Sequence, residues 1–190
     1  METLGTLIGV IAIFIGKELI AWFKEKNDTK KKPLKLLKSI SIGLEINRVL
    51  TELRILTGAN SVHVLGYHNG TIGFNGVSYQ YISMQYESTD KSTLPMINNY
   101  QNIPAGQFSE LMFKIHTEGY VQIDHNEDSV IGRLHRSYNV FSSYKFRIGN
   151  SIANGTVSLS YYNKEHKLSE RELQLCYDKV FEIENLLNRK

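Results

Sequence analysis

The sequence is poor in cysteine, and this scarcity limits the chemistry that the chain can support. Cys176 is the single cysteine among 190 residues, so no disulfide can form within the chain and no cysteine-based zinc site is available. This composition fits a reducing compartment such as the cytoplasm. We expect Cys176 to be a small core residue, because it lies near Leu173 and Val180 on the apolar side of a predicted helix.

The sequence also lacks the signatures of common enzymes. It contains no GxSxG, no P-loop, no GxGxxG before a helix and no HExxH, which are patterns of hydrolases, nucleotide-binding enzymes and zinc proteases. Cys176 is a poor nucleophile in the middle of an apolar helix face. The acidic segment 124–128 lacks the alternation and the glycine of an EF-hand loop. We therefore predict no catalytic activity and no metal site.

A basic field over the larger part of the chain is absent as well. The formal net charge of +3 arises from one segment, residues 24–38, which holds seven lysines against Glu25 and Asp28. The remaining residues carry nearly balanced charge. This distribution weakens a nucleic-acid-binding interpretation of the chain.

A long apolar stretch is present at the start of the sequence. Residues 4–23 are mostly apolar, with Lys17 and Glu18 as interruptions, and about 20 apolar residues cross a bilayer as a helix. The lysine-rich segment follows at once, and positively charged flanks stay in the cytoplasm. We predict a transmembrane helix at residues 1–23, in a single-pass protein of the inner (plasma) membrane whose C-terminal domain is cytoplasmic.

The segment after this helix, residues 24–38, is predicted to be a polybasic juxtamembrane linker that contacts anionic lipids. The predicted membrane-binding residues are Trp22, Lys24, Lys26, Lys30, Lys31 and Lys32. Two alternatives stay open. A signal peptide is disfavoured because the positive charge follows the apolar run. In the second alternative, the helix lies in the membrane interface or associates with copies of itself through Gly5 and Gly9.

Residues 39–190 have the size of one domain, and their patterns predict an α+β fold. Predicted helices cover residues 39–57, 104–119 and 129–138, and a last helix begins at a capping box formed by Ser169 and Glu172. Predicted strands cover residues 61–67, 77–86, 120–124, 140–148 and 156–162. The alternation slips at Tyr81 and Ile82, which suggests a β-bulge. An antiparallel sheet with both terminal helices on one face would bury their apolar stripes.

This order of elements, with the segment 155–187, resembles a GAF domain. Such domains typically close with a glycine-initiated strand, a polar turn and a helix that begins with a Leu-Ser-x-x-Glu-Leu pattern. The corresponding residues are Gly155, Leu159, Leu168, Ser169, Glu172 and Leu173. The helix at 44–56 running into residues 61–70 also fits, so the resemblance covers about residues 40–188.

The resemblance implies an architecture similar to that of PAS domains, with a pocket between the sheet and the segments over its other face. GAF domains hold cyclic nucleotides, bilins, haem or small metabolites there, or hold nothing and form dimers. This sequence has no cysteine where a bilin would be attached, and no Asn-Lys-Phe-Asp-Glu signature of cyclic-nucleotide-binding members. The cofactor therefore stays unassigned.

Polar residues around the first predicted hairpin are the candidate ligand-binding residues. His68 and Asn69 end a predicted strand, and a polar subsite forms if they converge with residues on the next strand; the alternative is a simple turn at Asn69 and Gly70. Tyrosines on the strands either line the pocket or simply favour sheet structure. The candidate set is His68, Asn69, Asn75, Tyr79, Ser83, Glu87 and Tyr144.

Three functional hypotheses follow from these patterns. The first is a membrane-anchored cytoplasmic GAF-like sensory or regulatory domain that binds a small molecule. The second is a ligandless scaffold at the inner membrane, a homodimer formed through the terminal helices 44–56 and 173–187. The third is a membrane-active lysis regulator of the phage type, whose domain controls the N-terminal helix. We favour the sensor, with membrane lipids, a small molecule and a second copy of the chain as its partners.

Overall fold

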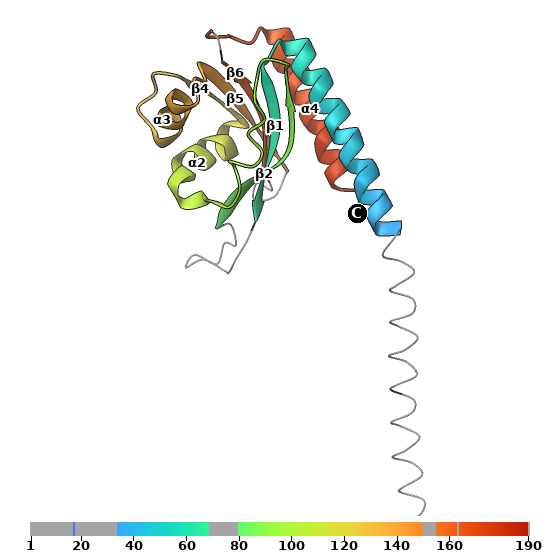
Figure 1. The fold of residues 1–190 in the computed structure, drawn as a ribbon. Coiled ribbons are helices and arrows are strands. Elements are labelled where there is room, and N and C mark those ends of the chain that lie inside the picture. Colours follow the sequence, from blue (N-terminus) through green and yellow to red (C-terminus); the bar gives the residue numbers. More distant parts are fainter. Residues whose placement is uncertain (1–16, 18–33, 69–79, 150–154, 163, 190) are drawn as a thin grey trace, which may run out of the picture. The chain divides into compact units, whose positions relative to one another are not determined.

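The computed structural model describes residue 17 and residues 34–68, 80–149, 155–162 and 164–189 (Figure 1). The chain forms two compact units, Met1–Ser41 and Ile42–Lys190. In the first unit, residues 34–41 are helical. The predicted membrane helix, apart from Lys17, lies outside the described residues, as does the linker up to residue 33. Among the described residues, no helix has the length and apolar character needed to cross a membrane.

A six-stranded antiparallel sheet organises the second unit, in the spatial order β3-β2-β1-β6-β5-β4. The strands are β1 Ser61–His68, β2 Tyr81–Thr89, β3 Ile103–Pro104, β4 Tyr120–Asp124, β5 Ser142–Ile148 and β6 Gly155–Tyr161. Five of them match predicted strands. The short edge strand β3 was missed, because two residues carry no measurable alternation.

Helical segments accompany the sheet in the second unit. They are the helix over residues 42–57, the 3-10 turn η1 Ala105–Phe108 with α2 Ser109–Glu118, then α3 Val130–Ser137 and α4 Glu170–Leu187. Gly119, with a φ of 83°, ends α2, and Ser169 with Glu172 forms the predicted capping box of α4. A helix was predicted to begin at Pro104; Pro104 ends β3 in an extended conformation and is the N-cap residue of η1, whose helical residues begin one position later. An edge strand tolerates proline, because the N–H groups on its outer side have no partner strand.

The helix over residues 42–57 and α4 lie side by side on one face of the sheet (Figure 1). Their buried apolar side chains meet those of β1, β5 and β6 in one core, which includes Leu50, Phe146 and Ile183. Cys176 is fully buried in this core, and burial raises the pKa of its thiol to about 12. The predicted helix-on-sheet packing and the structural role of the cysteine are therefore confirmed.

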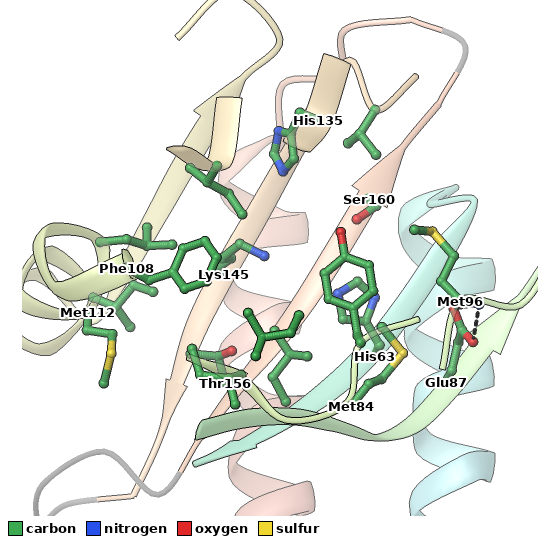
Figure 2. A pocket seen from close by; sticks show the side chains of 18 of the residues that line it. His63, Met84, Glu87, Met96, Phe108, Met112, His135, Lys145, Thr156 and Ser160 are labelled. Atoms are coloured by element: carbon green, nitrogen blue, oxygen red, sulfur yellow. Dashed lines mark hydrogen bonds between the residues drawn. The ribbon is translucent and has the colours of Figure 1, made fainter. Parts of the chain in front are cut away.

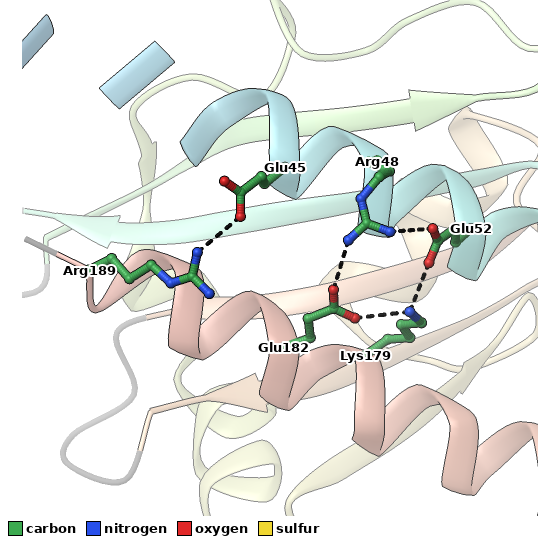
Figure 3. A network of polar contacts seen from close by, with 6 residues as sticks. All are labelled: Glu45, Arg48, Glu52, Lys179, Glu182 and Arg189. Carbon is green, nitrogen blue, oxygen red and sulfur yellow. Dashed lines mark hydrogen bonds and ion pairs between the residues drawn. The ribbon is translucent and has the colours of Figure 1, made fainter. Parts of the chain in front are cut away.

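Ion pairs join the same two helices at their exposed side (Figure 3). Lys179 of α4 donates to Glu52 at 2.8 Å and to Glu182 at 2.9 Å. Arg48 bonds both of these glutamates, and its contact with Glu182 is 3.0 Å long. The two helices are thus held by an apolar seam and by a charge network at the surface, in which Lys179 is partly buried.

A β-bulge in β2 decides which side chains face each layer. Val64 pairs with Tyr86, but the next residue of β1, Leu65, pairs with Met84, so Gln85 is the extra residue. Tyr86 packs against the helix-side core, whereas Met84 belongs to an apolar cluster on the other face. The predicted position of the bulge, near the start of the strand, was wrong, because pairing with β1 places the extra residue later.

Candidate functional site: a cavity with a polar floor

A cavity of about 60 Å³ lies on the second face of the sheet (Figure 2). It is covered by η1, α2, α3 and the segment that precedes β3. Most of its lining is apolar, with contributions from Leu65, Ile82, Met84, Phe108, Met112 and Ile115. The cavity therefore provides a largely dry environment, in which any polar group facing it interacts strongly.

The floor of this cavity is polar, because strand β6 alternates between two kinds of side chain. Val157 and Leu159 face the helices, whereas Thr156, Ser158 and Ser160 face the cavity side. All five are no more than 5% exposed. A strand with alternating apolar and polar residues usually exposes its polar side to water. Here both sides are buried.

Lys145 is the buried cation of the site. It lies in β5 between Tyr144 and Phe146, which belong to the helix-side core, so the alternation of the strand directs Lys145 to the cavity. The side chain is only 6% exposed, and its Nζ donates to Ser158 Oγ over 3.2 Å. Burial lowers the pKa of the amine to about 8.

Two buried histidines face the same cavity. His63 comes from β1 and His135 from the last turn of α3, which Ser129 caps at its other end. His135 Nε2 lies 3.1 Å from Ser143 Oγ, while Nδ1 of each ring has no hydrogen-bond partner among the described residues. Burial, reinforced by the charge of Lys145, lowers the pKa of both imidazoles to about 3. Both rings are therefore neutral at pH 7.

Glu87 is the one predicted ligand-binding residue that lines the cavity within the described residues. Its Oε2 accepts the backbone N–H of Met96 at 2.9 Å and that of Ile97 at 3.0 Å. Burial raises the pKa of the carboxyl, and these two hydrogen bonds partly oppose the rise. Glu87 thus fixes the covering segment to the sheet.

The other predicted site residues lie elsewhere. His68 Nε2 and Ser83 Oγ are 2.7 Å apart and form a separate pair outside the cavity lining. Tyr144 faces the helices, where its hydroxyl donates to His166 O at 2.9 Å and accepts the N–H of Leu168. Asn69, Asn75 and Tyr79 lie outside the described residues.

Lys145, His63 and His135 were not predicted from the sequence. A usable signal was present in β5 and β6, whose polar positions are mostly short Ser and Thr side chains instead of long charged ones. Short hydroxyls suit a buried surface better than an exposed one. Among the described residues, no group of three or more His, Cys, Asp or Glu side chains is placed to hold a metal ion.

Solved structures with a similar fold include a far-red cyanobacteriochrome photoreceptor, with a TM-score of 0.63, 10% identity and coverage of 88% of this chain and 97% of that chain. A phycocyanobilin-bound GAF domain of a cyanobacterial phytochrome has a TM-score of 0.60 and 16% identity, with coverage of 85% of this chain and 95% of that chain. The GAF domain/HD domain protein of Geobacter sulfurreducens has a TM-score of 0.59 and 12% identity, with coverage of 77% of this chain and 91% of that chain. The fold is that of a GAF domain.

At these identities the likeness establishes the GAF fold and nothing about the ligand. No protein-family model matches the sequence, and no curated protein matches it either. The predicted α+β class, with an antiparallel sheet flanked by helices, is confirmed. In this GAF fold the cavity occupies the predicted place, on the face of the sheet opposite the two terminal helices.

Proposed function

We propose that the chain is a sensory or regulatory protein that binds a small molecule in the cavity of its GAF fold. The observation that carries this proposal is a set of buried polar groups, Lys145, His63 and His135, that face the cavity and have incomplete hydrogen bonding. Folded proteins leave few buried polar atoms without a partner. A bound ligand would supply the missing partners.

The size of the cavity restricts the ligand. A water molecule needs roughly 10–15 Å³ of such space, so about 60 Å³ accommodates a compact molecule of a few heavy atoms. Two solved structures of this fold are described as phycocyanobilin-bound and phycoerythrobilin-bound. We propose a smaller ligand for this chain, held without catalysis.

Native mass spectrometry of the full chain tests this proposal. The expected result is a reproducible mass excess under native conditions that disappears on denaturation. The matched variant Met84→Trp, which fills the cavity from β2, should lose the excess, whereas the exposed control Phe113→Trp on α2 should keep it. A ligand-free mass, together with no thermal stabilisation by any compound in a metabolite panel, would contradict the proposal.

A second candidate function, dimerisation, is favoured by exposed apolar side chains on the terminal helices. Leu44 and Ile55 are 67% and 64% exposed, and their spacing of three helical turns places them on one face. Phe181 of α4 is 64% exposed. We propose that these residues join two copies of the chain. Sedimentation should show a dimer that Leu44→Lys with Ile55→Lys disrupts and Phe113→Lys leaves intact.

The sequence supports one further element of the proposal, a membrane anchor at residues 4–23 that holds the domain at the cytoplasmic side of the inner membrane. Trp22 and the lysines that follow would contact lipids there. Fractionation of cells tests it: the full chain should sediment with membranes, and a variant without residues 1–23 should not. Membrane association that survives this deletion would contradict the anchor.

A further inference from the structure

A continuous row of polar side chains crosses the floor of the cavity. The strand registers place Lys145 opposite Ser158, and Ser158 opposite His63, so three neighbouring strands contribute one residue each. Directly opposed side chains on one face of an antiparallel pair have Cβ atoms about 4.5–5.5 Å apart. The row therefore places a cation, a hydroxyl and an imidazole side by side on the cavity side of the sheet.

Lys145 has no ion-pair partner in this row. Among the described residues, no carboxylate lies within ion-pair distance of Lys145, and the Nζ donates one described hydrogen bond out of its three. Glu87, on the neighbouring strand beyond His63, is engaged by the backbone N–H groups of Met96 and Ile97. A buried cation without an ion-pair partner costs free energy, and no described carboxylate lies close enough to Lys145 to be one.

The two histidines add donors to the same space. Both side chains reach the cavity in Figure 2, His63 at 7% and His135 at 5% exposure. Each has an unpartnered Nδ1, and a neutral imidazole carries one N–H that can occupy that nitrogen. Together with the ammonium of Lys145, the site offers several donors and one uncompensated positive charge.

We infer that the cavity binds a small monocarboxylic acid, whose carboxylate pairs with Lys145 and accepts N–H groups of His63 and His135. The apolar part of the acid packs among Leu65, Met84 and the other apolar residues of the lining. One positive charge balances one negative charge, which favours a monoanion over a phosphate dianion. This inference rests on the proposed function, since it names the ligand class of the same cavity.

Calorimetric titration of the full chain at pH 7 tests the inference with matched probes. Propionate and butyrate are compared with propionamide and butyramide, which have nearly the same shape without the charge, and with inorganic phosphate, which lacks the apolar part. We expect at least one carboxylate to bind at least about tenfold more tightly than its amide, since hydrogen bonds to charged groups are the stronger kind.

The variant Lys145→Met should lower the affinity for that carboxylate about tenfold to a hundredfold and leave the affinity for the amide unchanged. Lys91→Met, which removes an exposed lysine outside the cavity, should change neither. If Lys145→Met does not fold, the discrimination between acid and amide by the unmodified chain decides the question.

The outcomes separate this inference from the proposed function. Equal binding of acid and amide, or binding of phosphate alone, overturns the carboxylic acid and leaves a small-molecule site in place. If no probe binds but native mass spectrometry shows a ligand, a released acid supports the inference and a neutral or cationic compound overturns it. If no probe binds and the native mass is ligand-free, both proposals fail.

Discussion

The two faces of the sheet are buried to a similar degree but by different kinds of side chain. On the helix side, β5 and β6 contribute Phe146, Val157 and Leu159 to a close-packed apolar core. On the cavity side, the same strands contribute Lys145 and Ser158, which burial penalises. Hydrophobic burial favours folding by about 25 cal/mol per Å², whereas incompletely bonded polar groups oppose it. One face therefore stabilises the domain, and the other retains groups that a ligand can use.

The largest expected effect of a single substitution lies on the helix side. Phe146→Ala removes a fully buried aromatic side chain and should lower the free energy of unfolding by about 3–5 kcal/mol. Phe113→Ala, at a residue that is 69% exposed, should change it by less than about 0.5 kcal/mol. Urea denaturation of both variants measures the difference. Similar losses at the two positions would contradict the assignment of the core.

The cavity side should make the domain sensitive to acid. The pKa of His63 and His135 is about 3 in the folded protein and about 6.5 in an unfolded chain. Between these values the unfolded state binds more protons, so the free energy of unfolding falls as the pH falls from 6.5 to 3, by a few kcal/mol.

His63→Gln should therefore move the midpoint of acid unfolding, followed by circular dichroism, to lower pH. The exposed control His116→Gln should leave the midpoint where it is. An unchanged midpoint in His63→Gln would show that this imidazole is not held neutral by burial.

Lys145→Met should stabilise the ligand-free protein at pH 7 by about 1–3 kcal/mol, because it replaces an unpaired buried cation with an apolar chain. The pKa of the amine is about 8 when folded, against 10.5 as its ordinary value. Between these values the unfolded state binds more protons, so the unmodified protein gains stability as the pH rises. The advantage of the variant should shrink between pH 8 and 10.5, and urea titrations at pH 7 and 10 compare the two. A less stable variant at pH 7 would contradict the buried-cation assignment.

The smallest effect is expected at the exposed charge network that joins the two helices. Lys179→Met removes the contacts with Glu52 and Glu182 (Figure 3), but ion pairs between partly exposed side chains at a surface contribute little, and salt screens them. Its small loss of stability should vanish at high ionic strength. A large loss of stability that persists at high salt would contradict this expectation, because it would show that these charges stabilise the helix pair more than the apolar seam beneath them does.

Local signals predicted most of the fold. The capping box at Ser169, the end of α2 at Gly119 and the alternation of β5 and β6 depend on neighbours in the chain, which the sequence displays directly. The predicted helix opening at Pro104 lies one residue before η1, and the prediction did not show that the same residue also ends β3, because a proline suits both a helix start and an edge strand. Nothing in the local pattern separates these two uses.

The site was harder to predict, because it depends on register between strands that are distant in sequence. His63, Ser158 and Lys145 become neighbours only through the pairing of β1 with β6 and of β6 with β5. A lysine on an alternating strand ordinarily indicates a solvent-facing position, whereas the amphipathic ring of its neighbour Tyr144 predicted a pocket-lining residue. Glu87 was selected as a polar residue near a hairpin, and the structure gives it a backbone-binding role at the same cavity.

The extra residue in β2 makes the composition of the cavity depend on the length of the chain as well as on its side chains. Met84 and Glu87 are three positions apart, and both face the cavity because Gln85 between them is the extra residue. One further residue inserted between Tyr86 and Glu87, with the bulge kept, would turn Glu87 to the helices. A change of one codon in length, with no substitution in the lining, would therefore alter which ligands fit. In this fold, insertions and deletions within a strand are a route to new binding specificity.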